Sequence, residues 1–137
     1  MSFVLDTSVL IELRRGNTTV ASLVKQLIKP DAPDASITYP TFSEYYFGCL
    51  DASEIGQKDC LEFLSSFRHL TLTKGSAIQY AQLMYRYRKK GVTLGPVDTL
   101  IASITIDSGM TLITLDKGFT KIRELKKIVL SQEKSGQ

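Results

Sequence analysis

The chain has 137 residues with a hydrophobic fraction of 43%, which is typical of one globular domain that buries a sizeable core. No apolar run approaches the roughly 18 residues of a membrane span, and we expect a cytoplasmic protein. The net charge of +3 is only mildly basic, so charge alone favours a nucleic-acid partner only slightly. We expect a single domain over residues 1–131 and a frayed tail over 132–137.

Short runs of strand type alternate along the chain with longer runs of helical periodicity. Strands are predicted at residues 3–5, 35–39, 69–73, 111–115 and 127–130. Helices are predicted at residues 8–13, 17–28, 41–50, 53–67, 76–90, 96–108 and 117–126. The Pro- and Asp-rich segment Lys29–Asp34 is predicted to be a turn, and Gly91 and Gly109 fit the ends of two helices. This alternation predicts an α/β fold in which helices flank a parallel sheet.

The chain contains two cysteines, Cys49 and Cys60. Their spacing fits no zinc-binding pattern, and one pair does not suggest a disulfide framework. We therefore expect buried, reduced thiols at both positions.

Four acidic residues stand at the ends of these elements. Asp6 and Asp116 each follow a predicted strand. Glu44 and Asp98 each fall in the first turn of a predicted helix, shortly after a proline. In an open parallel sheet, strand ends and helix starts converge on one crevice. Carboxylates about 4 Å apart repel by roughly 4 kcal/mol at an effective dielectric near 20, so four of them favour a bound cation, and Mg²⁺ or Mn²⁺ suits oxygen ligands.

The sequences around these acids form a recognisable set. In chain order they are Leu5-Asp6-Thr7-Ser8-Val9-Leu10-Ile11, Phe42-Ser43-Glu44, Val97-Asp98-Thr99-Leu100-Ile101-Ala102, and Leu112-Ile113-Thr114-Leu115-Asp116 with Phe119 beyond. This set, in this order and at these intervals, resembles the PIN domain and, within it, the VapC-like toxins of toxin–antitoxin pairs. The resemblance covers nearly the whole chain.

The resemblance implies a small Rossmann-like fold with a central parallel sheet of about five strands. It also implies a homodimeric, Mg²⁺- or Mn²⁺-dependent endoribonuclease that blocks translation by hydrolysing phosphodiester bonds of RNA, with tRNA or rRNA as the expected substrate. A toxin of this kind has a small antitoxin protein as its partner. The family's acids correspond to Asp6, Glu44, Asp98 and Asp116. Gly118 stands where members often carry a further acid.

Each acid is given an expected role in phosphodiester hydrolysis. Asp6, Asp98 and Asp116 would coordinate metal directly or through water, and Glu44 would hold a second ion or orient the attacking water. A metal-free route is disfavoured, because such ribonucleases commonly pair a general acid with a general base, and His69 is the only histidine.

Hydroxyl groups beside the acids would fix the carboxylates by hydrogen bonds, and these come from Thr7, Ser8 and Thr114. In the resemblance, Thr114 corresponds to the family's supporting hydroxyl before the last acid.

The basic stretch Tyr85-Arg86-Tyr87-Arg88-Lys89-Lys90 is the best candidate for RNA contact outside the acidic crevice. Arginine can bind phosphate, and tyrosine can stack on a base. The residues predicted to bind RNA are Arg86, Arg88, Lys89 and Lys117. The alternative is a helix whose tyrosines pack inward and whose basic residues favour the negative end of the helix dipole.

Other interpretations stay open at this point. Each acid by itself could be a helix cap or a solvated surface residue. The chain could also be a catalytically silent PIN-like module that binds RNA or protein, although such modules usually lack one or more acids. A receiver-like signalling domain is a further alternative, although Asp6 is followed by Thr7-Ser8 rather than by a second acid.

Overall fold

The computed structural model describes residues 2–29 and 35–131, so the predicted tail and all but the first residue of the predicted turn Lys29–Asp34 lie outside the described residues. A five-stranded sheet has the order β3-β2-β1-β4-β5, and every neighbouring pair is parallel. The strands are β1 (Phe3–Leu5), β2 (Ala35–Thr38), β3 (Arg68–Leu70), β4 (Thr111–Thr114) and β5 (Lys127–Val129). The helices are α1 (Thr7–Arg14), α2 (Thr18–Leu27), α3 (Tyr39–Cys49), α4 (Glu54–Ser65), α5 (Lys74–Lys89), α6 (Pro96–Asp107) and the 3₁₀ helix η1 (Lys117–Lys121). The predicted α/β class with a parallel five-stranded sheet is confirmed.

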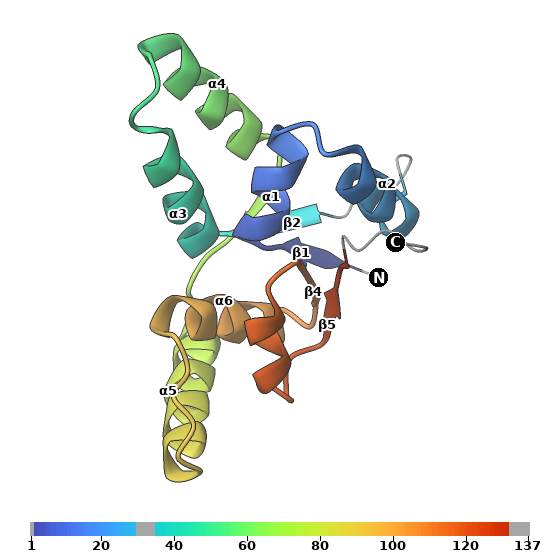
Figure 1. Ribbon diagram of the computed structural model, residues 1–137. Coiled ribbons are helices and arrows are strands. Elements are labelled where there is room, and N and C mark those ends of the chain that lie inside the picture. The colour runs from blue at the N-terminus through green and yellow to red at the C-terminus, as the bar shows by residue number, and fades with distance from the viewer. Residues whose placement is uncertain (1, 30–34, 132–137) are drawn as a thin grey trace.

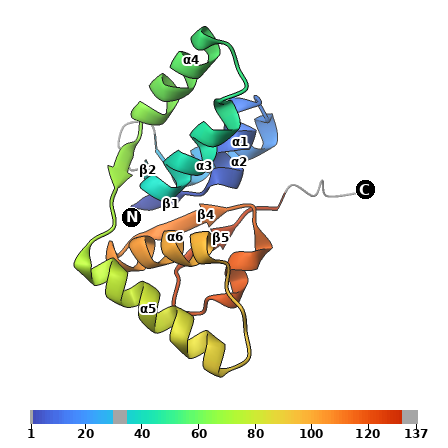
Figure 2. The same cartoon turned by 90° about the vertical axis from the view of Figure 1, so that its left-hand side faces the viewer.

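The two faces of the sheet are covered by different helices. Helices α1 to α4 lie on one side and α5, α6 and η1 on the other (Figures 1 and 2). Because successive side chains of a strand point to opposite faces, Phe3 and Leu5 pack into the core under α1 to α4, whereas Val4 packs into the core under α5 and α6. On β4, Ile113 and Leu112 divide in the same way. Burial on both faces explains why these strands are continuous apolar runs.

The order in which strands are added to the sheet reverses at its centre. From β1 the chain moves outward through β2 to β3, and it then returns to the other side of β1 to form β4 and β5. Strands β1 and β4 therefore lie side by side, with Leu5 opposite Ile113. In open parallel sheets, ligands bind outside the carboxyl ends of the strands at such a reversal. Asp6 follows β1 directly, and its backbone N–H donates to the carbonyl of Ile113 at 3.0 Å.

The helix predicted over 117–126 is wrong in type and length. Only Lys117–Lys121 is helical, and it is a 3₁₀ helix. Its hydrogen bonds, and the turn after it, join residues three apart: Ile122 N–H donates to Phe119 O at 3.1 Å, and Leu125 N–H donates to Ile122 O at 3.3 Å. These three buried side chains recur at a spacing of three, which matches 3₁₀ turns better than the 3.6-residue period of an α-helix.

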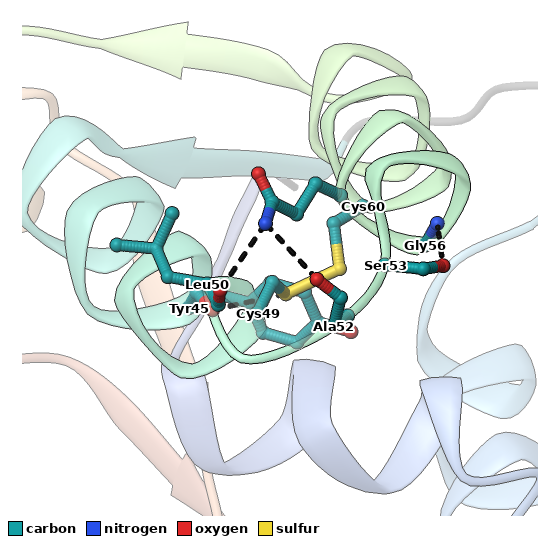
Figure 3. Close-up of a disulfide and its surroundings, with 8 residues drawn as sticks. Tyr45, Cys49, Leu50, Ala52, Ser53, Gly56 and Cys60 are labelled. Carbon is teal, nitrogen blue, oxygen red and sulfur yellow. Dashed lines mark hydrogen bonds between the residues drawn. A yellow bond between two sulfur atoms is a disulfide. The ribbon is translucent and has the colours of Figure 1, made fainter.

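The expectation of reduced thiols is also wrong. Helices α3 and α4 form a hairpin in which Cys49 and Cys60 make a disulfide, with their Cα atoms 6.7 Å apart (Figure 3). The turn between the helices is tight because Gln57 Nε2 donates to the carbonyls of Leu50 and Ala52, at 3.1 and 3.0 Å. The number of cysteines alone could not show that this turn brings the pair together.

Most other predicted boundaries shift by one to three residues. The largest consequence concerns α3, which begins at Tyr39 because the Thr38 side chain caps it, accepting from Thr41 N–H at 3.2 Å. Glu44 therefore lies in the second turn of α3 rather than the first. Both predicted helix ends at glycine are confirmed, since Gly91 and Gly109 follow α5 and α6 with φ values of +75° and +68°. Across the described part of the chain, no helix has both the length and the apolar character needed to cross a membrane.

Candidate active site

Asp6 lies at the carboxyl end of β1 and is only 4% exposed. It occupies the N-cap position of α1, but its side chain makes no capping hydrogen bond. Instead, its Oδ2 accepts from Ser8 Oγ at 2.9 Å and from Thr114 Oγ1 at 2.7 Å. The carboxylate is therefore held by side chains from both central strand ends, and its role as a simple helix cap is excluded.

The two hydroxyls that hold Asp6 are themselves fixed by the backbone after β4. Ser8 Oγ accepts from Leu115 N–H at 3.0 Å, and Thr114 Oγ1 accepts from Asp116 N–H at 2.9 Å. Each hydroxyl therefore donates its proton to the carboxylate of Asp6, which can only accept, while its own oxygen accepts from a backbone N–H. We call Asp6, Ser8 and Thr114 the floor of the site.

The other three acids come from elements around this floor, and we call Glu44, Asp98 and Asp116 the rim. Glu44 projects from α3, where its Oε1 accepts from Thr7 Oγ1 at 2.8 Å. Asp98 lies in the first turn of α6 and is partly buried. Asp116 is exposed after β4, and its Oδ1 accepts from Gly118 N–H at 2.8 Å, so it also caps η1.

Asp98 of the rim interacts electrostatically with the other three acids of the site. Burial raises the pKa of Asp98 most, and the three other carboxylates raise it further, to about 6. Among the three, Asp116 acts most strongly, followed by Asp6 and then Glu44. A carboxylate interacts with three others in this way only when all four share one region. The structure thus brings together the four acids that the sequence singles out, and we call the group the acidic site.

The chemistry of the acidic site suits a hard divalent cation. Within residues 2–29 and 35–131, no lysine or arginine forms an ion pair with any of the four acids, so these residues do not compensate their negative charge. All the donors are carboxylate oxygens, which Mg²⁺ and Mn²⁺ prefer. Yet no three described Asp, Glu, His or Cys side chains converge closely enough to form a ready-made metal cluster. Mutual repulsion of uncompensated carboxylates favours such an open arrangement, which a cation would contract.

The predicted RNA-binding residues fall in two places. Lys117 begins η1 beside Asp116 and is exposed. Arg86, Arg88 and Lys89 lie in the last turns of α5. Arg86 is engaged within the fold, since its Nη2 lies 3.1 Å from Glu124 Oε2.

The comparison with known families excludes one of the remaining interpretations. The PIN domain model matches residues 3–125. The chain belongs to the PIN domain family. The receiver-like alternative is thereby excluded, and the strand order agrees, since receiver domains have the order 2-1-3-4-5. A search of curated protein sequences finds no match.

Solved structures with a similar fold include several VapBC proteins. VapBC2 from Rickettsia felis, bound to a DNA fragment from its promoter, matches with a TM-score of 0.82 and 22% identity over 96% of this PIN domain chain and 100% of the other. VapBC-1 from nontypeable Haemophilus influenzae gives 0.79 and 21% over 94% and 98%. FitAcB from Neisseria gonorrhoeae gives 0.78 and 23% over 92% and 96%. At these identities the matches establish the fold.

Proposed function

We propose that this PIN domain is a Mg²⁺- or Mn²⁺-dependent endoribonuclease and the toxin of a toxin–antitoxin pair. The observation that carries the proposal is the grouping of four acids around the ends of β1 and β4, where Ser8 and Thr114 hold the buried Asp6. Burial raises the pKa of Asp98 most, and the carboxylates of Asp116, Asp6 and Glu44 raise it further. A cation is the partner that such a site requires. A cation bound at the acidic site can attract the negatively charged phosphate of a phosphodiester.

A bound divalent ion would supply a water of lowered pKa and would neutralise charge on the phosphate. The residues that would hold it are Asp6, Asp98 and Asp116, with Glu44 holding a second ion or orienting the attacking water. Asp6 presents Oδ1 for this purpose, because both hydroxyl donors of the floor bind Oδ2. Asp98 must lose its proton before it can bind a cation, so cleavage should rise as the pH passes about 6.

The hydroxyl groups act by holding the carboxylates in place. Ser8 and Thr114 fix the orientation of Asp6, and Thr7 fixes one oxygen of Glu44 from the first turn of α1. Loss of a hydrogen bond that orients a metal-binding side chain typically lowers metal affinity or activity by about 10- to 100-fold.

The test is cleavage of tRNA and rRNA by the purified protein with Mg²⁺ or Mn²⁺, with and without a chelator. We expect cleavage by the wild type, none with the chelator, and none by Asp6→Asn or Asp98→Asn, each of which should remain folded. Asp59→Asn is the matched control, because Asp59 is an exposed acid of α4 outside the acidic site. Full activity of both site variants with metal present would contradict the assignment.

A second candidate function is a silent PIN module that binds RNA or protein without cutting. It is favoured by one observation, namely that no three metal-ligating side chains of the described residues are already clustered. Titration calorimetry with Mn²⁺ separates the two functions without an activity assay. Saturable Mn²⁺ binding that Asp98→Asn weakens supports the nuclease, whereas no binding at millimolar Mn²⁺ supports the silent module.

We also propose a small antitoxin as the partner of this chain. The structurally similar VapBC proteins were solved as complexes, and a basic side chain from a partner would find the uncompensated charge of the acidic site favourable. Co-expression with the product of the neighbouring gene tests this, with co-purification and loss of cleavage expected. The predicted homodimer is tested by light scattering of the purified chain.

A further inference from the structure

The C-terminal half of α5 and the loop after it enclose a groove of about 520 Å³. Ala81, Met84, Tyr85 and Arg88 form one wall, because they recur at helical spacing on one side of α5. The loop 91–94 forms the other wall, and Figure 2 shows the chain returning beside α5 to the start of α6. This volume lies within the roughly 300–1,000 Å³ of small-ligand sites.

The side chains of the basic stretch of α5 fall into two groups, of which only one lines the groove. Tyr87 is buried and donates from its hydroxyl to Glu124 at 2.7 Å, and Arg86 pairs with the same glutamate, so both side chains hold the segment after η1 against α5. Tyr85, by contrast, is 54% exposed, with Lys89 Nζ 5.4 Å from its ring centroid, and Arg88 is exposed and forms no ion pair with any described residue. The first pair of side chains stabilises the fold, whereas Arg88 and the exposed part of the Tyr85 ring are open to a ligand.

The groove leads toward the acidic site. Its loop wall ends at the buried Leu94, and the next residue, Gly95, is the N-cap of α6. A methyl group on the Gly95 Cα would lie 3.6 Å from Oδ2 of Asp98, so the end of the loop is next to that carboxylate. A ligand that spans from the acidic site along this loop therefore reaches the groove.

We propose that this groove, the base groove, binds one base of single-stranded RNA that flanks the scissile phosphate. Tyr85 stacks on the base, and the guanidinium of Arg88 binds the adjoining phosphate. The inference rests on the proposed nuclease function and adds a position, outside the acidic site, at which single-stranded RNA is recognised.

The lining of the base groove matches a nucleotide in both polarity and charge. Its surface is mainly apolar, from Ala81, Met84 and Leu94, which suits the face of a base. Stacking on an exposed aromatic ring tolerates any base, and a neighbouring arginine adds a fork of donors for phosphate. A base can enter such a groove only when it is unstacked from its neighbours, so the expected substrate segment is a single-stranded loop.

Binding is measured separately from cleavage. A fluorescein-labelled single-stranded decaribonucleotide is titrated with protein in EDTA, and anisotropy gives the affinity. We expect Arg88→Ala and Tyr85→Ala each to weaken binding about tenfold and Tyr85→Phe to leave it unchanged. Arg88→Ala should also reduce the slope of log affinity against log salt by about 0.7, the value for one phosphate contact on a single strand.

Arg86→Ala is the matched control, because it removes the same charge from the same helix but from a side chain paired with Glu124. Its binding should stay within twofold of the wild type. Thermal unfolding checks that each variant is folded. Equal losses for Arg86→Ala and Arg88→Ala would reduce the effect to general charge and overturn the base groove.

Two further outcomes separate this inference from the proposed function. RNA that binds with the expected variant pattern but is not cut when metal is added would contradict the nuclease and leave the base groove standing. RNA that is cut equally well by wild type, Tyr85→Ala and Arg88→Ala would overturn the base groove alone. Groove variants that lose self-association or antitoxin binding while keeping RNA affinity would assign the groove to a protein and overturn the proposal.

Discussion

The floor and the rim of the acidic site are built on opposite physical principles. The floor is held by attraction, since two hydroxyls from different parts of the chain donate to one oxygen of Asp6. The rim carboxylates repel one another, since the pKa of Asp98, raised most by burial, is raised further by the other three carboxylates, to about 6. The comparison teaches that the chain fixes one carboxylate firmly and leaves the others for a ligand to gather.

The largest expected effect separates the floor from the rim by activity. Asp6→Asn should lower kcat/KM at least about 100-fold, the scale of one lost electrostatic contact to a transition state. Glu44→Gln, which changes an exposed rim residue, should lower it about tenfold. Both values come from initial rates on the same RNA at saturating Mg²⁺. A larger loss for Glu44→Gln than for Asp6→Asn would reverse the roles assigned to floor and rim.

The next effect concerns the helix that carries Glu44. The disulfide between Cys49 and Cys60 closes a short loop at the end of α3, so its loss should lower the free energy of unfolding by about 2–3 kcal/mol. Urea unfolding of the wild type with and without dithiothreitol measures this loss. The double variant Cys49→Ser, Cys60→Ser should be as stable as the reduced wild type and insensitive to the reductant. A reductant effect that persists in the double variant would show that the disulfide is not its cause.

A third effect tests the floor by removing one hydroxyl. Thr114→Val deletes the donor to the buried Asp6 and removes the acceptor of the part-buried N–H of Asp116, so the free energy of unfolding should fall by about 1–3 kcal/mol. Thr7→Val is the rim counterpart, and its exposed hydrogen bond to Glu44 should contribute less than about 1 kcal/mol. Urea unfolding in EDTA gives both values, and similar losses for the two variants would remove the distinction.

The smallest effect is a gain in stability from the rim. The pKa of Asp98 is raised from 3.8 to about 6 in the folded state, so the metal-free protein binds more protons when folded than when unfolded. Its free energy of unfolding therefore falls as the pH rises from about 4 to about 6. Asp98→Asn removes this loss. After allowance for solvent screening, the variant should be about 1 kcal/mol more stable than the wild type at pH 7 in EDTA, and the difference should vanish near pH 4. A constant difference across this pH range would contradict the cause.

The sequence was sufficient for the parallel α/β fold and for the selection of the four acids, because apolar strands and the residues at their ends are local signals. The order of the strands is not local. Asp6 and Thr114 are 108 residues apart, and only the pairing of β1 with β4 brings them within 2.7 Å. The sequence therefore predicted Thr114 as a supporting hydroxyl through the family resemblance, but not that it binds Asp6.

Two features could not be read from the sequence for physical reasons. The disulfide depends on the tight turn between α3 and α4, which is set by the amide of Gln57 reaching back to two carbonyls. Which arginine of α5 is held by the fold depends on Glu124, which lies 38 residues from Arg86 and pairs with Arg86 rather than with Arg88. In both cases side-chain contacts decide between interpretations that the sequence pattern leaves equal.

The placement of β4 between β1 and β5 has a consequence for how the chain is made. Asp116 joins Asp6 only after residues 111–116 have been synthesised and β4 has inserted beside β1. A growing chain has no assembled acidic site until then, because this closing step is non-local. If the proposed nuclease activity holds, a chain that is still being made would therefore be inactive until β4 has paired with β1.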